Sequence, residues 1–350
     1  MTLSTWLAGS SRRAAVGAGA AALALAAASA PFTVSADEIV VGMMPKFTSD
    51  PYFVAANKGA DEAAAELGIK LEFNGPVDAN IAAQVDIVDR WVRRRVDAIA
   101  VSANDANALA PAMKRAMDAG IVTMTWDADV APHARSAFLN QATFEGMGRT
   151  MVEMMVRSAG TSEGEFLIVT AVLTAPNQNR WIEEIKKYAA EKYPGMKFPA
   201  TLPGDEDLEK SKNVAFNYLQ ANPDTKGVYC VTGIATPGVI EAVKQLDLVG
   251  KVAVTGLGVP SLIRPFLKDG SLKEAALWNP VDIGYGAVYI TKALLDGTLD
   301  PASGHVEAGR LRKLGVISGD TILPRDPMIF TKDKVDQVNF LTGVPTSRPP

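Results

Sequence analysis

Residues 97–126, DAIAVSANDANALAPAMKRAMDAGIVTMTW, hold the pattern that decides the fold. Two short apolar runs, residues 97–101 and 121–126, flank a segment in which Leu109 and Met113 are spaced by four residues. This spacing is typical of an amphipathic helix, and the flanking runs are typical of buried strands. Because a strand, a helix and a second strand form a right-handed crossover, the two strands are predicted to be parallel.

The alternation begins before this stretch. Residues 39–41 predict a strand, and a helix is predicted from about Pro51 to a glycine stop at Gly68. A second strand over residues 69–73 and a second helix over residues 81–92 follow. Strands and helices that alternate in this way form an α/β sheet with helices on both faces.

The pattern starts again after about residue 165. Val101 and Trp126 are 126 − 101 = 25 positions apart, and Val231 and Gly256 are 256 − 231 = 25 positions apart. Each of these intervals holds a strand end, a helix and the next strand. We therefore predict two similar doubly wound parallel-sheet lobes rather than one long sheet.

Short ordered crossings are expected to join the lobes, because no Pro/Gly/Ser-rich linker separates them. We expect these crossings near Asn140, near Asn279 and within residues 316–324. The predicted N-terminal lobe comprises residues 37–141 plus about 281–317, and the predicted C-terminal lobe comprises residues 142–280 plus about 318–345.

Residues 1–36 have the three parts of a secretory signal peptide. Arg12 and Arg13 are followed by the apolar run 14–28 and by the small-residue exit Val34-Ser35-Ala36. We favour cleavage after Ala36. The paired arginines leave twin-arginine export open beside ordinary secretion. The chain is thus expected in the periplasm.

Charge and composition narrow the class of protein. The 350 residues include 35 Lys and Arg against 39 Asp and Glu, a formal net charge of −4. Without a basic excess, nucleic acid is not an expected partner. Hydrophobic residues make up 48% of the chain, which is typical of a globular protein with a sizeable core.

Polar and aromatic side chains follow the predicted strands of both lobes. Ligands of open α/β sheets bind outside the carboxyl ends of the strands. Sugars need amide and carboxylate groups for their hydroxyls and aromatic faces for their C–H groups. The expected ligand-binding residues are Lys46, Phe47, Asp50, Tyr52, Phe53, Asn104, Asp127, Asn140, Asn177, Gln178, Asn179, Gly233, Gly258, Trp278 and Asn279.

Sequence patterns that resemble enzyme motifs do not occur in the structural context that catalysis requires. Residues 160–164 match G-x-S-x-G, but a helix is predicted before them and a strand after them, the reverse of a nucleophile elbow. His133 and His305 are the only histidines and lie far apart, and Cys230 is the only cysteine, within an apolar run. We therefore expect no catalytic residue, no metal and no cofactor.

Several segments resemble a known family. Asp50-Pro51-Tyr52-Phe53, followed by an Ala/Gly-rich helix, resembles the first turn of ribose-type periplasmic sugar-binding proteins of ABC transporters. This resemblance implies the type I periplasmic binding protein fold over residues 38 to about 340. Segments that are similar to the rhamnose-binding branch are residues 101–105, 177–179, 255–258 and 278–282. Segments that are similar to the autoinducer-2-binding branch are residues 44–46, 125–127 and 140–141.

The resemblance also implies contacts. It assigns ligand contacts to Lys46, Asp127, Gln178 and Asn179, with backbone or packing near Gly233. The autoinducer-2 branch has an aspartate at the position of Asn177, which argues against that ligand here. The ribose branch has an aspartate in the loop that is Gly256-Leu257-Gly258 in this chain. A deoxysugar is expected to fit better than ribose.

The sequence therefore predicts the solute-binding component of an ABC importer. It would capture a rhamnose-like deoxysugar or a related monosaccharide between its lobes and, as a monomer, deliver it to a membrane permease that has a separate ATPase. The alternative is that the chain binds autoinducer-2 for uptake. A secreted enzyme and a sugar-sensing regulator are less favoured, because the first lacks an activated nucleophile and the second would need an N-terminal helix-turn-helix.

Overall fold

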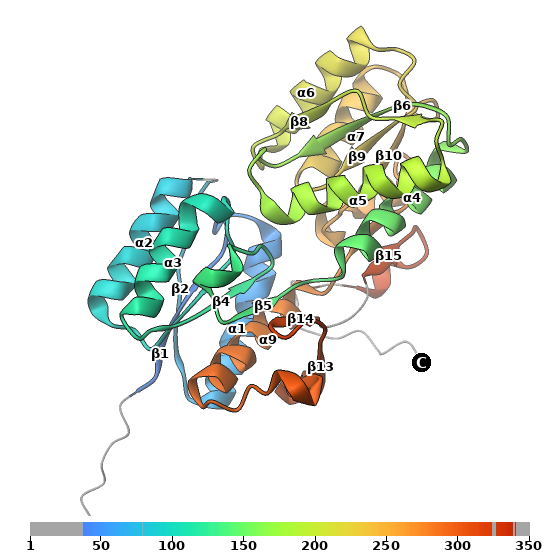
Figure 1. The fold of residues 1–350 in the computed structure, drawn as a ribbon. Coiled ribbons are helices and arrows are strands. Elements are labelled where there is room, and N and C mark those ends of the chain that lie inside the picture. Colours follow the sequence, from blue (N-terminus) through green and yellow to red (C-terminus); the bar gives the residue numbers. More distant parts are fainter. Residues whose placement is uncertain (1–37, 79, 324–326, 339, 341–350) are drawn as a thin grey trace, which may run out of the picture. The chain divides into compact units, whose positions relative to one another are not determined.

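The computed structural model describes residues 38–78, 80–323, 327–338 and 340. The described residues from Glu38 onward form one compact unit that contains two main β-sheets (Figure 1). The predicted signal peptide lies outside the described residues. Both sheets are built mainly from parallel strands linked through helices, so the predicted α/β fold is confirmed.

The first sheet has eight strands in the order β12-β13-β14-β5-β4-β3-β1-β2. The five strands β1 to β5 pair in parallel, as the crossovers require, and β14 joins them in parallel next to β5. β12 and β13 extend this edge in antiparallel pairing, which the sequence did not predict. The strands are β1 (Val40–Met44), β2 (Lys70–Phe73), β3 (Ala98–Val101), β4 (Val122–Trp126), β5 (Ala137–Leu139), β12 (His305–Glu307), β13 (Lys313–Val316) and β14 (Thr321–Leu323).

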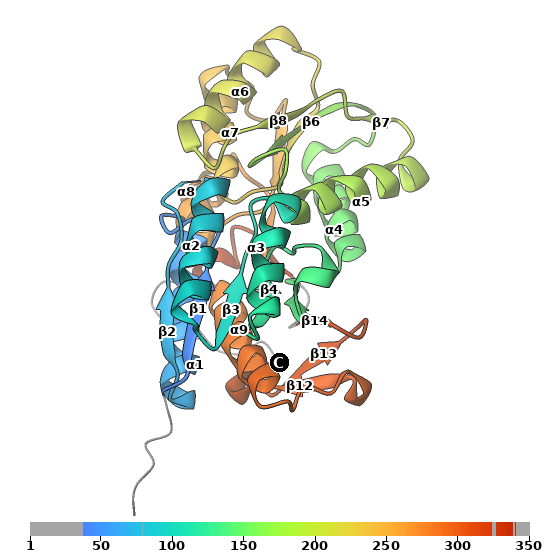
Figure 2. The same ribbon diagram turned by 60° about the vertical axis from the view of Figure 1, so that its left-hand side comes forward.

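Helices cover both faces of the first sheet (Figure 1 and Figure 2). Successive strand residues point to opposite faces. Val41 and Met43 of β1 belong to the core shared with the helices α1 and α9, whereas Met44 packs with α2 and α3. The four helices are α1 (Pro51–Leu67), α2 (Ile81–Arg94), α3 (Ala106–Asp118) and α9 (Pro280–Leu295).

The second sheet is entirely parallel. Its order is β10-β9-β6-β7, and β8 also pairs with β6. The strands are β6 (Gly164–Thr170), β7 (Met196–Lys197), β8 (Thr201–Pro203), β9 (Gly227–Cys230) and β10 (Ala253–Gly256). The helices that accompany it are α4 (Phe144–Ala159), α5 (Pro176–Lys192), α6 (Leu208–Ala221), α7 (Ala235–Gln245) and α8 (Pro260–Asp269).

The chain passes between the two sheets more than once. It leaves the first sheet after β5 and returns through α9, which follows the short strand β11 (Ala275–Leu277). It leaves again after β14 and reaches β15 (Met328–Phe330), which pairs antiparallel with β11. This last passage follows Leu323, because β14 still pairs with β5. The 3-10 turns are Pro132–Ala134, Pro301–Ser303, Gly309–Leu311 and Val335–Gln337.

The helices α1 and α9 approach each other through glycine. A Cβ atom added at Gly284 of α9 would lie 1.9 Å from the carbonyl oxygen of Ala56 in α1. On the facing helix, a Cβ added at Gly59 would lie 1.9 Å from the carbonyl oxygen of Val281. Both glycines therefore permit a backbone contact that any larger residue would push apart.

We expect Gly284→Ala to lower the free energy of unfolding by about 2 kcal/mol, because the added methyl must separate α1 from α9. Urea denaturation measures this change. Gly315→Ala is the matched control, since a Cβ there has no atom within 4 Å, and it should stay within about 0.5 kcal/mol of the unaltered chain. Equal stability of the two variants would contradict the tight helix contact.

Candidate functional site

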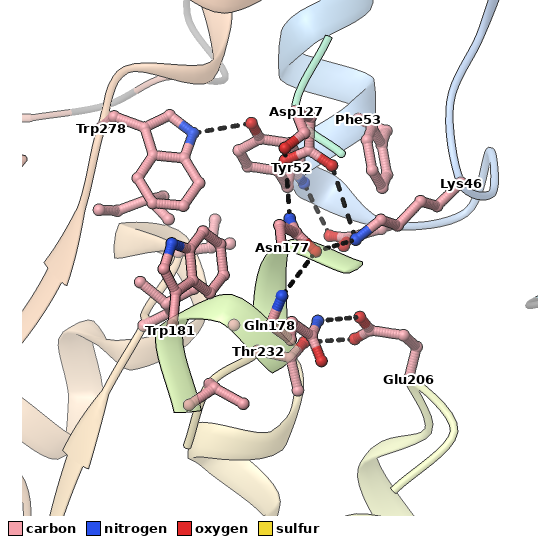
Figure 3. Close-up of a pocket in the computed structure, with 16 residues that line it drawn as sticks. Lys46, Tyr52, Phe53, Asp127, Asn177, Gln178, Trp181, Glu206, Thr232 and Trp278 are labelled. Carbon is pink, nitrogen blue, oxygen red and sulfur yellow. Dashed lines mark hydrogen bonds and ion pairs between the residues drawn. The ribbon is translucent and has the colours of Figure 1, made fainter. Parts of the chain in front are cut away.

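One pocket collects the polar strand-end residues of both sheets (Figure 3). The first sheet supplies residues that follow β1 and β4, and the second supplies residues that follow β6, β8, β9 and β10. The lining consists of Lys46, Asp50, Tyr52, Phe53, Asp127, Asn177, Gln178, Trp181, Glu206, Val231, Thr232, Gly233, Leu257, Val259, Leu277 and Trp278.

A buried ion pair marks the first-sheet side of the pocket. The Lys46 Nζ lies 3.7 Å from the Asp127 Oδ2, and both side chains are only 5% exposed. Asn104 accounts for part of the lysine's placement, because its Nδ2 donates to the Lys46 carbonyl oxygen over 2.9 Å. A charge pair this deep requires further hydrogen bonds to offset its desolvation.

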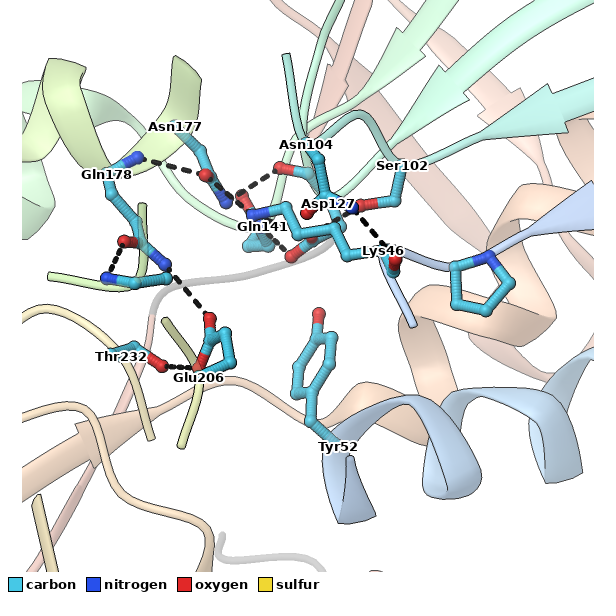
Figure 4. A network of polar contacts seen from close by, with 12 residues as sticks. Lys46, Tyr52, Ser102, Asn104, Asp127, Gln141, Asn177, Gln178, Glu206 and Thr232 are labelled. Carbon is cyan, nitrogen blue, oxygen red and sulfur yellow. Dashed lines mark hydrogen bonds and ion pairs between the residues drawn. The ribbon is translucent and has the colours of Figure 1, made fainter. Parts of the chain in front are cut away.

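Asp127 receives those further hydrogen bonds from neighbouring strands (Figure 4). Ser102, after β3, donates from its Oγ to the Asp127 Oδ2 over 2.6 Å, and the Gln141 Nε2 donates to the Oδ1. Asp127 has a φ of 62°, a left-handed conformation that is uncommon outside glycine. Asp129, two residues on, pairs instead with Arg135 over 2.8 Å, so only the first of these two aspartates lines the pocket.

The first turn of α5 links the second sheet to this ion pair. The Lys46 Nζ donates to the Asn177 Oδ1 over 2.9 Å, and the Asn177 Nδ2 donates to the Asp127 carbonyl oxygen over 3.4 Å. Gln178 is anchored to β6, since its Oε1 accepts from the Thr170 hydroxyl over 2.6 Å and from the Ala171 N–H over 2.8 Å. This anchoring turns the Gln178 Nε2 donor toward the pocket.

Aromatic side chains form another wall of the pocket. The Trp278 Nε1 donates to the Tyr52 hydroxyl over 2.7 Å, and the two rings meet edge to face. Trp181 lies against Trp278 with ring centroids 5.6 Å apart. Figure 3 shows the two indoles on the opposite side of Asn177 from Lys46. The pocket therefore offers both polar groups and flat apolar faces.

Two further carboxyls line the pocket, and neither forms an ion pair with another described residue. Asp50 caps α1, and its Oδ1 accepts from the Tyr52 N–H over 2.8 Å. Burial, together with the nearby Glu206 carboxylate, raises the pKa of Asp50 to about 7. Burial also raises the pKa of Glu206, although hydrogen bonds from Thr232 and Gln178 oppose this effect.

The structure brings together nine of the fifteen residues expected in the site. These are Lys46, Asp50, Tyr52, Phe53, Asp127, Asn177, Gln178, Gly233 and Trp278. The other six, which support the site or lie beside it, are Phe47, Asn104, Asn140, Asn179, Gly258 and Asn279. Asn279 caps α9 through a 3.0 Å bond from the Val281 N–H, and the Asn179 Nδ2 donates to the Leu173 carbonyl oxygen over 2.9 Å.

Sequence reasoning missed Trp181 and Glu206. Trp181 follows Asn177 and Gln178 by four and three residues, so a helix beginning at Pro176 places all three on one face. Glu206 follows β8, a three-residue strand that ends in Pro203 and was not predicted. Proline within such a short run conceals the strand, and with it the strand end.

Within the described residues, no group of three or more His, Cys, Asp and Glu side chains is arranged to hold a metal ion. Cys230 is fully buried at the end of β9, and this burial raises its thiol pKa to about 12. The thiol is therefore protonated at neutral pH and belongs to the core, as its apolar sequence context predicted.

Two doubly wound sheets with a mixed polar and aromatic pocket at their strand ends define a type I periplasmic binding protein. The family model described as periplasmic binding protein domain matches residues 41–299, and the chain belongs to this family. The resemblance drawn from the sequence is thus confirmed. The family implies a periplasmic location, and none of the helices in the described part of the chain is both long and apolar enough to span a bilayer.

Three similar proteins represent the family. The D-allose-binding periplasmic protein of Escherichia coli K12 is 27% identical over 68% of this chain and 79% of its own length. The structure of LsrB from Clostridium saccharobutylicum in complex with AI-2 has a TM-score of 0.81 at 27% identity, covering 86% of this chain and 100% of that one. An ABC transporter solute-binding protein from Clostridium phytofermentas with bound L-rhamnose has a TM-score of 0.78 at 25% identity, covering 85% and 97%.

The raised pKa of Asp50 predicts a pH-dependent stability. The folded state holds this proton up to about pH 7, whereas the unfolded chain releases it near the ordinary value of 3.8. The Asp50 contribution to the free energy of unfolding is therefore greatest below pH 4 and is lost as the pH rises to 7. Asp50→Asn keeps the helix cap and removes the titration.

Urea denaturation of the unaltered chain and of Asp50→Asn at pH 4.5, 6 and 8 measures this effect. Relative to the variant, the unaltered chain should lose on the order of 2 kcal/mol of stability between pH 4.5 and 8. Titrating groups that are not coupled to Asp50 contribute equally to both proteins. Their contributions therefore cancel in the difference in stability between the unaltered chain and the variant. Parallel stability curves across this range would contradict the raised pKa of the buried Asp50 carboxyl.

Proposed function

We propose that this chain is the sugar-binding component of an ABC importer in the periplasm. The observation that carries the proposal is the pocket itself, in which Lys46, Asp127 and Gln178 face the indoles of Trp181 and Trp278. Such a combination of hydrogen-bonding groups and aromatic faces suits a monosaccharide. Its relatives include solute-binding proteins with bound sugars, which supports binding without chemistry.

A rhamnose-like deoxysugar is the ligand class that we propose. Apolar side chains from the loops after β9 and β10 and from β11 occupy part of the lining, namely Val231, Leu257, Val259 and Leu277. A hydroxyl placed against these groups would lose its hydrogen bonds, whereas a methyl group would lose none. The similar structure with bound L-rhamnose supports this choice.

Capture by closure is the proposed mechanism. We take the first lobe as residues 37–141 with about 281–317 and the second as residues 142–280 with about 318–345. Because β14 pairs with β5, residues 318–323 are moved to the first lobe. Contacts already join them beside the pocket, including Lys46 to Asn177 and a 3.2 Å bond from the Thr174 hydroxyl to the Asn104 carbonyl oxygen. A ligand touching both lobes would favour the closed state, which then docks on a membrane permease.

Autoinducer-2 is the second candidate ligand. The similarity to LsrB in complex with AI-2 favours it, and Lys46, Asp127 and Gln178 all line the pocket. Against it stands Asn177, whose amide replaces the aspartate of that branch. The Asn177 Oδ1 is already engaged by Lys46.

Thermal-shift measurements on protein lacking residues 1–36, refolded to remove any bound solute, test the proposal. The panel comprises pentoses, hexoses, deoxyhexoses, sugar alcohols and autoinducer-2. A ligand at about 100 times its Kd stabilises the fold by about 2.7 kcal/mol. We expect a deoxyhexose to give the largest shift, and a largest shift with autoinducer-2 would replace our choice with the second candidate.

Two variants locate the binding. Asp127→Asn removes the carboxylate in the pocket and should weaken binding at least about tenfold, equivalent to about 1.4 kcal/mol. Asn179→Ala alters a residue outside the lining and should leave the Kd within about twofold. Isothermal titration measures both. A shift with none of the compounds would contradict sugar binding.

A further inference from the structure

Glu206 differs from Asp50 and Asp127, the other carboxyls of the pocket. It forms no ion pair with a described residue, and it does not cap a helix. Its Oε2 accepts from the Thr232 hydroxyl, and its Oε1 lies 3.4 Å from the Gln178 Nε2 (Figure 4). Both donors are neutral. Among the described residues no Lys, Arg or His forms an ion pair with Glu206, although the side chain is partly buried.

Each of the two other carboxyls has a partner of a kind that Glu206 lacks. Asp127 pairs with Lys46, the single basic residue in the described lining. Asp50 sits at the N-terminus of α1, where the backbone N–H groups and the helix dipole favour a negative group. The pocket thus holds three carboxyls against one lysine, and among the described residues Glu206 has neither an ion pair nor a backbone N–H donor.

The backbone at Glu206 has a strained conformation. Asp205 and Glu206 have φ values of 51° and 53°, two consecutive left-handed residues that are not glycine. Hydrogen bonds tie this turn to the end of β6, from the Gly204 N–H to the Thr170 carbonyl over 2.8 Å and from the Asp205 N–H to the Ala171 carbonyl over 2.9 Å. Strained residues that are fixed in this way cluster at ligand-binding sites.

Trp181 supplies a separate indication of the ligand. The side chain is 1% exposed and lines the pocket, yet its indole N–H has no hydrogen-bond partner in the described protein. A buried donor without an acceptor is costly. The ring also lies next to Trp278, and aromatic faces of this kind attract cations.

We propose that the solute carries an ammonium group that pairs with Glu206, together with a hydroxyl oxygen that accepts from Trp181. The ligand class is therefore an aminodeoxy sugar. This inference rests on the proposed function and narrows it, since an amine in place of one hydroxyl keeps the sugar ring that the pocket walls accommodate. The bound ammonium provides the positive charge that none of the described residues pairs with Glu206.

Matched pairs of sugars test this inference. Glucosamine, galactosamine, mannosamine and a 4-amino-4,6-dideoxyhexose are each compared with the corresponding neutral sugar by isothermal titration, at a pH at which the amine is protonated. We expect at least one amino sugar to bind about 30-fold more tightly than its neutral partner, as for a desolvated charge pair. Glu206→Gln, which is isosteric and keeps an acceptor for Thr232, should abolish this difference.

Asp205→Asn is the matched control, because it removes the adjacent charge from a residue outside the pocket lining, and it should preserve the preference for the amine. Thermal unfolding of the ligand-free variants checks that both are folded. Tighter binding of the neutral sugars throughout, or a preference for the amine that survives Glu206→Gln, overturns the inference and leaves the sugar-binding function intact. Failure of every sugar to bind overturns both.

Discussion

The buried ion pair between Lys46 and Asp127 is the constraint on which the site depends. Because neither charge reaches water, each must be satisfied by groups that other elements bring to the same place. Ser102 and Gln141 meet Asp127, and Asn177 meets Lys46 from the start of α5. The parallel topology makes this convergence possible, since it places the carboxyl ends of neighbouring strands at one edge of each sheet.

Most of the parallel framework could be predicted from the sequence. Runs such as residues 98–101 and the spaced apolar residues of α3 have clear periods, and each strand is followed by a helix. The edge formed by β12, β13 and β14 was not predicted, because these strands have only three or four residues each. It joins the sheet through β14, which pairs with the distant strand β5. Short strands carry too little pattern to identify alone.

Some residues of the site could be predicted from the sequence, and others could not. Lys46 and Asp127 follow strands that the sequence identifies, and Gln178 lies near the start of a predicted helix. All three line the pocket. Asn140 and Asn279 have the same residue type in similar places but do not line it, because an asparagine at a turn or cap has local backbone partners. Glu206 could not be predicted, since its position depends on a hidden strand and two left-handed residues. The resulting pocket is polar and aromatic, which favours a sugar, and it has an excess of negative charge, which favours an amine on that sugar.

A crystal structure of the chain with its tightest-binding compound tests the central claim most directly. The account predicts a single sugar ring between the two sheets, hydrogen-bonded to Asp127 and Gln178 and stacked on an indole of Trp181 or Trp278. A ligand bound instead in the surface groove that runs beside α2 from Asn74 to Arg90, or one that touches residues of only one sheet, would contradict it.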